Sequence, residues 1–339
     1  MRQSNIQVVG TLALNIVPHL LKEPLISPGT FAEVGSVEFR LGGPVANVSR
    51  VMRQLGSSVH MVACIGDDEL GDTVRRLVQN EFECTYNLSV VAGCTTSYSV
   101  VIQAPGVDRA IWHHIGANAT FDGSSVDPCM SEIIHLGYPA ILPKILADDA
   151  AGLRRLFDSA KGVGVTTSLD LSCLSPRSFG TGVNWHSLMG DLLPRVDIMS
   201  PSLDDLCVAL GISGDPPLKC AARAAEYLID CGAAVAMVTA GPAGFALCAG
   251  SETRIAESRL LSPVARTWAE TRMSCPAKYV YNAQTGGAGD SATAGLLFGL
   301  LAGLPPRHVV GLVASIAGRW VSGSRFFDPF DEVLYGLSS

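Results

Sequence analysis

The stretch Thr285–Gly295, "TGGAGDSATAG", places a glycine-rich turn directly before an apolar, helix-like run. Glycine lets the backbone adopt positive φ and approach a ligand closely, and the first turn of a helix leaves amide N–H groups without partners. We therefore predict that the amides of Gly287, Ala288 and Gly289 form a cradle for an anion such as a phosphoryl group. One such donor contributes about 10²–10³-fold to a rate when it stabilises developing charge.

Asp290 follows this turn at the predicted start of the helix, where its negative charge is unfavourable beside an anion site. A carboxylate there can accept the proton of an attacking hydroxyl, a general-base effect of about 10²–10⁴-fold. The structural alternative is a helix N-cap, which is a common use of aspartate after glycine. The hexapeptide alone favours the cap, so the catalytic interpretation depends on the rest of the chain.

Composition indicates a well-buried globular protein, because 48% of the 339 residues are hydrophobic and only 16% are charged. The net charge of −7 and the absence of a basic cluster argue against a nucleic-acid partner. Ten cysteines without a Cys-x-x-Cys pair indicate reduced, mostly buried thiols rather than a zinc site or a disulfide framework.

No membrane partner is expected. The most apolar segment, 294–318, is divided by Pro305 and Pro306 into pieces shorter than a bilayer requires, so it predicts two buried helices. The first 17 residues resemble a first strand more than a signal peptide, because they lack a convincing cleavage site. These features favour a cytoplasmic location.

Runs of small and β-branched apolar residues alternate with helix-like segments along the chain. The strand-like runs are 6–10, 59–66, 163–171, 196–200 and 233–240. Such alternation predicts an α/β fold with a mostly parallel sheet covered on both faces. A helix is predicted between Pro44 and Gly56, with Gly56 as its left-handed C-terminal cap. For 251–282 we predict edge strands with loops.

Two segments, 18–40 and 95–118, interrupt this rhythm with short alternating runs and turn residues, the second with a hairpin at 104–109. We predict that they form a small antiparallel sheet near the carboxyl ends of the parallel strands, where ligands bind in this architecture. The predicted division is a core of 1–16, 41–94 and 119–339 and a β lid of 17–40 and 95–118.

Three motifs together resemble those of the ribokinase-like, or phosphofructokinase-B, sugar kinases. They are "RLGGPVANVSRVMRQLGSSVHMVACIGDDELGD" at 40–72, "MVTAGPAG" at 237–244 and "QTGGAGDSATAGLLFGL" at 284–300, in the family's order along nearly the whole chain. The resemblance implies a three-layer α/β/α core with a β lid. It also implies transfer of the γ-phosphoryl group of ATP, with Mg²⁺, to a hydroxyl of a sugar or sugar-like substrate.

The resemblance also implies roles for individual residues. Asp290 would be the general base, and the turn Gly287–Gly289 would be the anion hole. The residues that would bind substrate are Asn15, Gly42, Gly43, Asn47 and Asp170. Those that would bind nucleotide are Thr239, Gly241, Gly244 and Thr285. Structural alternatives remain: an Asn47 bonded to its own backbone, a strand-end cap at Asp170 and an ordinary turn at 239–244.

The chain departs from the family pattern at a few positions. Asn15 stands where an aspartate commonly holds two sugar hydroxyls, which removes charge-assisted binding there. Asp205 is a shortened form of the family's glutamate and would hold Mg²⁺ through water. Gln284 and Gly286 replace an acid and a threonine, which puts activation by a monovalent cation in doubt.

Three further hypotheses follow from the same residues. A nucleoside kinase of the same fold could stack a base on Trp112 and the histidines His113 and His114, of which alternation points one inward. A catalytically weak relative would bind sugar or nucleotide without turnover. A homodimer through the lid would bury Ile111 and Trp112.

Overall fold

The computed structural model describes residues 4–21, 28–29, 31–103, 109–171, 182–281 and 283–323. Its centre is a nine-stranded sheet of order β13-β12-β11-β10-β9-β8-β1-β4-β5. In chain order these strands are β1 (Ser4–Gly10), β4 (Val59–Gly66), β5 (Thr85–Val91), β8 (Ser131–Gly137), β9 (Thr166–Asp170), β10 (Ile198–Met199), β11 (Val235–Thr239), β12 (Phe245–Ala249) and β13 (Arg272–Cys275). All neighbours pair in parallel except β12, which is antiparallel to β11 and β13.

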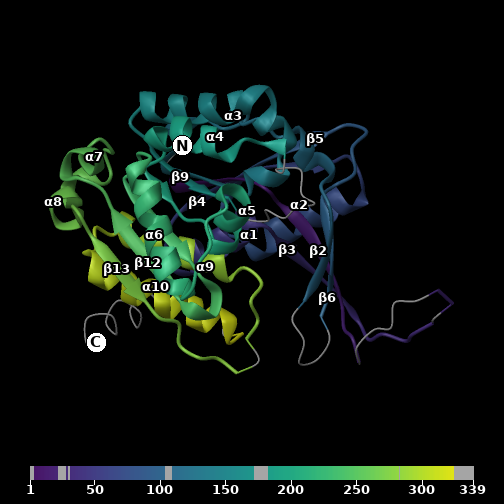
Figure 1. The fold of residues 1–339 in the computed structure, drawn as a ribbon. Coiled ribbons are helices and arrows are strands. Elements are labelled where there is room, and N and C mark those ends of the chain that lie inside the picture. The colour runs from purple at the N-terminus through teal and green to yellow at the C-terminus, as the bar shows by residue number, and fades with distance from the viewer. Residues whose placement is uncertain are drawn as a thin grey trace.

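Helices cover both faces of this sheet and make three layers, with α3 and α4 above it and α10 below it in Figure 1. One face packs against α1 (Pro44–Gln54), α2 (Glu69–Glu81), α7 (Glu252–Ala256), α8 (Ala265–Trp268), α9 (Ala288–Leu301) and α10 (Pro306–Val321). The other packs against α3 (Pro143–Gly162), α4 (Trp185–Leu192), α5 (Leu203–Leu210) and α6 (Pro217–Asp230). The predicted α/β/α architecture is therefore confirmed.

Successive side chains of a strand point to opposite faces of the large sheet, so each strand contributes to two hydrophobic cores, one on each face. Val8 lies in the core beneath α1, and its neighbour Val9 lies in the core beneath α3. A strand buried on both sides has no solvent-exposed face, which is why the runs at 6–10 and 59–66 are apolar apart from the buried Gln7 and His60. The helix at 44–54 is confirmed, and Gly56 after it has φ 85°.

The prediction of edge strands for 251–282 is correct only for β13. The rest of its described part contains α7 and α8. Helix α7 begins after Ser251, whose hydroxyl accepts the amide of Arg254 at 3.3 Å. Ile255 and Trp268 anchor these helices in the core. Helices of five and four residues are too short to produce a helical period in the sequence, which explains the error.

A separate four-stranded sheet of order β3-β2-β6-β7 forms the part at the right of Figure 1. We call it the small sheet; its strands are β2 (Ala13–Pro18), β3 (Val37–Gly42), β6 (Tyr98–Ile102) and β7 (Ala110–His114). The β2/β3 and β6/β7 pairs are antiparallel, and β2 joins β6 in parallel. The predicted second sheet is therefore present, whereas 104–108 of its predicted hairpin turn lie outside the described residues.

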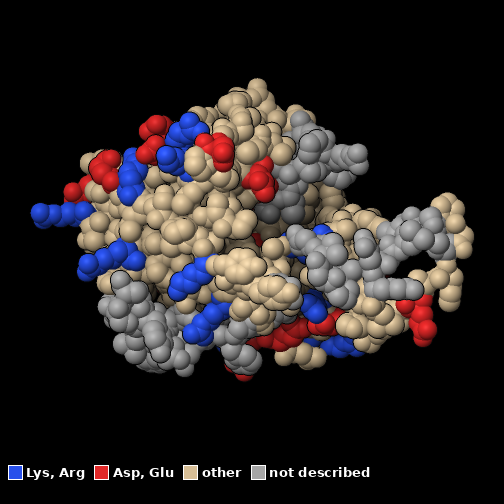
Figure 2. Space-filling view, turned by 60° about the horizontal axis from the view of Figure 1, so that its bottom comes forward, with Lys and Arg blue, Asp and Glu red and all other residues tan. Residues whose placement is uncertain are grey.

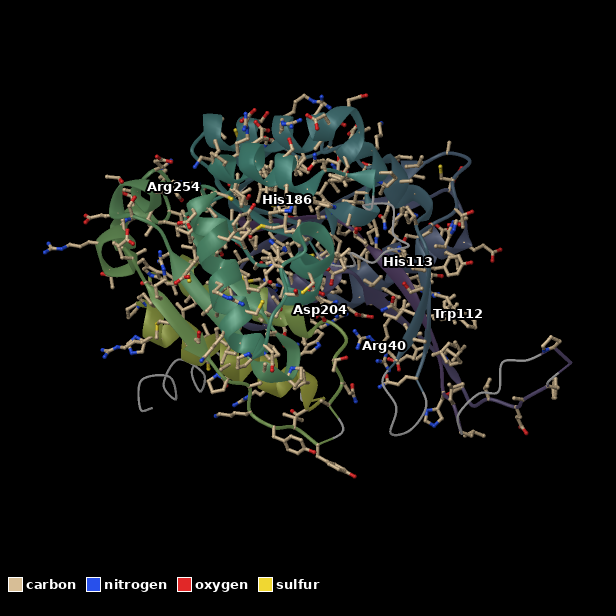
Figure 3. All side chains as sticks on the ribbon, viewed as in Figure 1. Arg40, Trp112, His113, His186, Asp204 and Arg254 are labelled. Atoms are coloured by element: carbon tan, nitrogen blue, oxygen red, sulfur yellow. The ribbon has the colours of Figure 1, made fainter. Side chains whose placement is uncertain are left out.

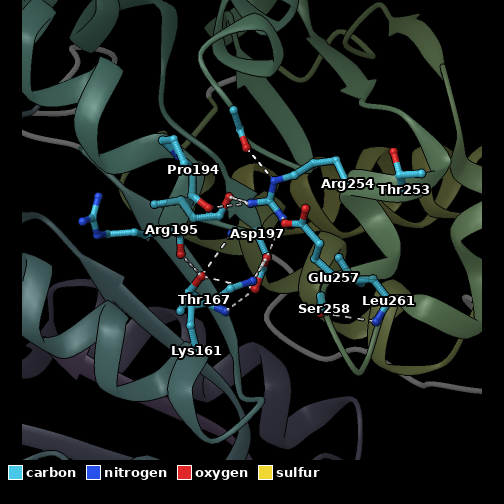
Figure 4. Close-up of polar contacts among 12 residues, drawn as sticks. Lys161, Thr167, Pro194, Arg195, Asp197, Thr253, Arg254, Glu257, Ser258 and Leu261 are labelled. Atoms are coloured by element: carbon cyan, nitrogen blue, oxygen red, sulfur yellow. Dashed lines mark hydrogen bonds and ion pairs between the residues drawn. The ribbon is translucent and has the colours of Figure 1, made fainter.

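A buried ion-pair network ties the large sheet together at the amino ends of its strands (Figure 4). The fully buried Asp197 accepts hydrogen bonds from Lys161 Nζ at 2.7 Å and Arg254 Nη1 at 3.0 Å, and also from the amide of Thr167. The Arg254 guanidinium also donates to the backbone carbonyls of Gly232 and Val196. Because removing one partner of a buried ion pair is strongly destabilising, this network fixes α7 to β9 and β10.

The described part of the chain contains neither a membrane-spanning helix nor a disulfide bond. None of its helices is long and apolar enough to cross a membrane. The apolar segment 294–318 contains the end of α9 and most of α10, which confirms the two predicted helices. The cysteines within it are free thiols.

Candidate active site

The carboxyl ends of three parallel strands meet the first turns of two helices. Gly137 of β8 pairs with Gly10 of β1 on one side and with Asp170 of β9 on the other, so the three strands end at the same level. Pro44 packs so closely against this edge that a Cβ on Gly137 would lie 2.3 Å from its ring. The first turn of α1 is therefore held at the strand ends, and α9 approaches it from the same side of the sheet.

Asp290 is the third residue of α9 and is 1% exposed. Its Oδ2 accepts hydrogen bonds from Asn47 Nδ2 and from the Tyr138 hydroxyl, both at 2.8 Å. Its Oδ1 is buried and has no hydrogen-bond partner. The helix-cap interpretation does not describe this geometry, because the carboxylate bonds to two distant side chains and not to the amides of its own helix.

The surroundings of Asp290 act on its pKa in opposite directions. Burial raises the pKa of this carboxyl above its ordinary value, and the hydrogen bonds from Asn47 and Tyr138 oppose that rise. Desolvation disfavours the charged form, whereas donors to a carboxylate stabilise it. The result is a carboxylate that is more basic than one in water and whose ionised form is supported at one oxygen only.

Tyr138 reaches Asp290 from an unusual backbone conformation, with φ 61° and ψ 48°. Its amide donates to the Asp170 carbonyl at 3.2 Å, which holds the residue directly after β8. A non-glycine residue in the left-handed region costs about 1–3 kcal/mol, and such outliers gather at functional sites. Tyr138 therefore adopts an unfavourable conformation that directs its hydroxyl at the buried carboxylate.

The glycine-rich turn before Asp290 is held by several contacts. Gly287 has φ 79°, and a Cβ there would lie 2.9 Å from Trp320 Cζ2 and 3.0 Å from Asn47 Nδ2. The Trp320 indole N–H donates to the Gly286 carbonyl at 2.6 Å. The Ala288 amide donates to the Thr285 carbonyl at 3.1 Å. Of the three predicted cradle amides, Ala288 is therefore already bonded within the turn.

A family model described as "pfkB family carbohydrate kinase" matches residues 4–322. The chain belongs to the pfkB family. Members of this family are phosphotransferases, and the three sequence motifs that resemble the family lie within the matched residues. A ribokinase of Haemophilus influenzae is 23% identical over 238 residues, which cover 70% of this chain and 73% of the relative.

Solved structures share the complete pfkB-type fold. The structure of Arabidopsis thaliana ribokinase complexed with ribose and ATP has a TM-score of 0.74 and 19% identity, covering 100% of both chains. The adenosine kinase of Sinorhizobium meliloti has a TM-score of 0.70 and 16% identity, covering 94% of both chains. Because a sugar kinase and a nucleoside kinase are similarly close, fold alone does not select the acceptor.

The turn that the pfkB resemblance assigns to nucleotide lies between β11 and β12. Gly241 has φ 51° and Gly244 has φ 109°, and a Cβ on Gly244 would lie 2.0 Å from the Cys275 carbonyl. The Thr239 amide donates to the Pro201 carbonyl at 3.1 Å, which joins this turn to the residues that precede α5. Glycine is therefore required at Gly244 both by the backbone and by the space available.

Two acidic residues follow on α5. Asp205 is buried in a capping box, where its Oδ2 accepts the Ser202 hydroxyl at 2.5 Å and its amide donates to that hydroxyl at 3.1 Å. Its neighbour Asp204 is exposed and lies toward the small sheet in Figure 3. The described residues contain no group of three or more potential metal ligands. A metal here would therefore rely on water and substrate oxygens.

Of the predicted substrate residues, the small sheet contributes Asn15 and Gly42, and the others lie in or next to α1 and at the end of β9. The Asn15 side chain lies against Gly42, where a Cβ would lie 2.3 Å from Asn15 Nδ2. Gly43, with φ 85°, is the N-cap of α1, and its carbonyl accepts the Asn47 amide at 2.9 Å. The Asn47 side chain bonds to Asp290, so its structural alternative, a bond to its own backbone, is wrong. Asp170 is buried at the end of β9.

Sequence reasoning missed three residues of this region. Tyr138 contacts Asp290, and Trp320 contacts the glycine-rich turn. Arg109, which immediately precedes β7, donates to the Thr285 hydroxyl and lies beside Gly286. None of the three belongs to a motif. The only local sign was Gly137-Tyr138-Pro139 directly after a buried strand, a position where polar side chains reach ligands.

Proposed function

We propose that this protein is an ATP-dependent kinase that phosphorylates a hydroxyl of a sugar or sugar-like substrate. The observation that carries the proposal is the asymmetric carboxylate of Asp290. Its Oδ2 is held by Asn47 and Tyr138, and its Oδ1 is buried without a partner at the glycine-rich start of α9. Such a group accepts a proton well, because it is basic, fixed and shielded from water.

In the proposed reaction the substrate hydroxyl attacks the γ-phosphorus of ATP and loses its proton to Asp290 Oδ1. The bond between the γ-phosphorus and the β,γ-bridging oxygen breaks, and ADP leaves. Negative charge on the transferred group meets the N-terminus of α9, where the amides of Gly287 and Gly289 have no partner among the described residues. Helix N-termini stabilise such charge through these amides and the helix dipole.

Arg109, next to β7 of the small sheet, brings a positive charge to the glycine-rich turn before α9. The Arg109 guanidinium bonds to the Thr285 hydroxyl, next to the proposed cradle. A cation at this point stabilises the charge of a transferring phosphoryl group. We assign Thr285, with Thr239, Gly241 and Gly244, to the nucleotide side of the site.

Mg²⁺ fits this set of residues as an ion bound mainly through water and phosphate oxygens. It typically uses one or two carboxylates and keeps several waters. The exposed Asp204 and the capping Asp205 supply carboxylates at the start of α5, and of these the exposed Asp204 is free to face a hydrated ion. When bound, Mg²⁺ would neutralise phosphate charge.

We assign the acceptor side to Asn15, Gly42, Gly43, Asn47 and Asp170, which surround the strand ends below the small sheet. The nucleoside alternative loses its main support, because the register places Trp112 on the opposite face of the small sheet from Asn15. In Figure 3, Trp112 lies on the outer side of that sheet, away from the core. Base stacking on Trp112 is therefore not part of the proposal.

The outer face of the small sheet supports the proposed homodimer. Cross-strand register places four apolar side chains in one row across all four strands: Phe39, Ile16, Val100 and Trp112. Phe39 is 43% exposed and Trp112 is 53% exposed. A contiguous exposed apolar row marks an interaction surface, and the equivalent face of a second copy is its proposed partner.

The direct test is ADP release with Mg·ATP and a panel of pentoses, hexoses, sugar acids and nucleosides. Release with a sugar or sugar acid supports the proposal. Release with nucleosides alone would favour the nucleoside kinase. Binding of acceptor or ATP without any ADP release would indicate the catalytically weak relative.

A further inference from the structure

The inner face of the small sheet carries a row of polar side chains. In the register, Asn15 pairs with Arg40 of β3 and with Ser99 of β6, and Ser99 pairs with His113 of β7. Residues directly opposite each other on neighbouring strands project from the same face, with Cβ atoms about 4.5–5.5 Å apart. Ser99 Oγ and His113 Nδ1 are 2.9 Å apart, so the row is also connected at the side chains.

Three observations show that this row faces the core. Asn15 lies against Gly42, whose chain continues into α1 and Asn47. Arg109, which directly precedes β7 and by alternation lies on the side of His113, contacts Thr285 in the turn before α9. Figure 3 places Arg40 between the small sheet and the core, and Figure 2 shows the surface hollowed between these two parts. The row therefore borders the proposed acceptor site.

The charge of this row differs from that expected for a neutral sugar. Asn15 supplies an uncharged amide where the resemblance expects an aspartate, and the Arg40 guanidinium is its direct cross-strand neighbour. Burial, with a smaller effect from His114, lowers the pKa of His113, which disfavours its charged form. Arg40 is the member of the row that carries a permanent charge.

Arg40 is incompletely satisfied. Its Nη2 bonds to Glu38, two residues earlier on the same strand, and its Nε is buried without a hydrogen-bond partner. The side chains of this ion pair are 35% and 56% exposed, and pairs so open to solvent are weak. A carboxylate that approaches Arg40 from the proposed acceptor site can therefore accept a hydrogen bond from Nε and compete with Glu38 for the guanidinium.

We propose that the acceptor is a polyhydroxy carboxylic acid, that is, a sugar acid whose carboxylate binds Arg40 beside the Asn15 amide. This rests on the proposed kinase function. A planar guanidinium takes a carboxylate with two parallel hydrogen bonds, and a single guanidinium balances a single negative charge. A phosphate group carries more charge and more oxygens and would require further cations, whereas Arg109 is engaged at Thr285.

The test compares matched pairs of acceptors, D-gluconate with D-glucose and D-ribonate with D-ribose, with D-fructose 6-phosphate as the phosphorylated probe. The wild-type protein should release ADP with an aldonate at a kcat/KM higher than with its neutral partner. Arg40→Met should raise the KM for the aldonate about 10- to 100-fold, and Arg40→Lys should restore part of that loss. Arg75→Met is the matched control, because Arg75 is a similarly exposed, ion-paired arginine on α2.

Two further variants should change the preference for the aldonate in opposite directions. Glu38→Gln frees Arg40 and should lower the KM for the aldonate, and Asn15→Asp should shift preference toward the neutral sugar. Preference for a neutral sugar or a sugar phosphate, or an aldonate KM unchanged in Arg40→Met, would overturn the inference and leave the kinase intact. Aldonate binding by calorimetry without ADP release would instead refute the kinase and retain the carboxylate site.

Discussion

The hydroxyl of Tyr138 donates a 2.8 Å hydrogen bond to Oδ2 of Asp290, across 152 residues of sequence. Asn47 donates to the same oxygen from the opposite element, α1. Two donors on one oxygen fix the plane of the carboxylate and leave the other oxygen for the proton. Residues after β8, at the start of α1 and at the start of α9 thus converge on a single oxygen atom.

Tyr138→Phe removes one of the two donors and keeps the ring. Because a donor stabilises the ionised form, the pKa of Asp290 should rise further and the acidic limb of kcat/KM should move to higher pH. At pH values on the acidic limb, where Asp290 is partly protonated, kcat/KM of the variant should be about 10-fold or more below that of the wild-type protein. A pH–rate profile measures both effects.

The matched control for this variant is Tyr86→Phe, because the Tyr86 hydroxyl accepts a 2.8 Å bond from Gln79 on the surface. Its profile should coincide with that of the wild-type protein. If the acidic limb stays in place in Tyr138→Phe, Tyr138 does not position the base.

Asp290→Asn should not destabilise the protein at neutral pH. Burial raises the folded-state pKa of Asp290, so between the unfolded and folded pKa values the folded protein binds more protons than the unfolded chain. The free energy of unfolding contributed by this group therefore falls as pH rises through that window. Asparagine removes the cost of the buried charge and can still accept both hydrogen bonds through its Oδ1.

Urea unfolding at neutral pH should therefore give Asp290→Asn a free energy of unfolding at least equal to that of the wild-type protein. The advantage should shrink as the pH falls toward 4. A clear loss of stability at neutral pH would show that the charge of Asp290 holds the fold together.

Gly287→Ala should impair turnover more than Gly289→Ala does. An alanine at 287 must adopt φ 79°, at a cost of about 1–2 kcal/mol, and its Cβ would approach Trp320 and Asn47. Gly289 lies within α9, and a Cβ there meets no atom within 4 Å. Thermal unfolding and kcat of both variants decide this point, and equal effects would contradict the proposed geometry of the turn.

Trp112→Glu should weaken self-association without changing the KM for the acceptor, because Trp112 lies on the face of the small sheet opposite to Asn15. Sedimentation equilibrium measures the dissociation constant of the dimer. A wild-type protein that stays monomeric, or a dimer that tolerates the charge at this position, would exclude this face as the interface.

The sequence predicted the parts of the molecule that depend on local pattern. The buried strands and the helices at 44–54, 288–301 and 306–321 were predictable from their apolar residues. The two glycine-rich turns were predictable because glycine readily adopts the positive φ that both turns contain. The contacts of Tyr138, Arg109 and Trp320 depend on which strand ends meet, and no local pattern records that. The short α7 and α8 were missed because they contain too few residues to show a period.

The identity of Asp290 as the base is tested most directly by single-turnover ADP formation in the Asp290→Asn protein, with Mg·ATP and the best acceptor bound at saturation. We expect normal binding of both substrates and a rate of phosphoryl transfer lowered by at least about 10²-fold. Full transfer activity in this variant would show that Asp290 is not the general base.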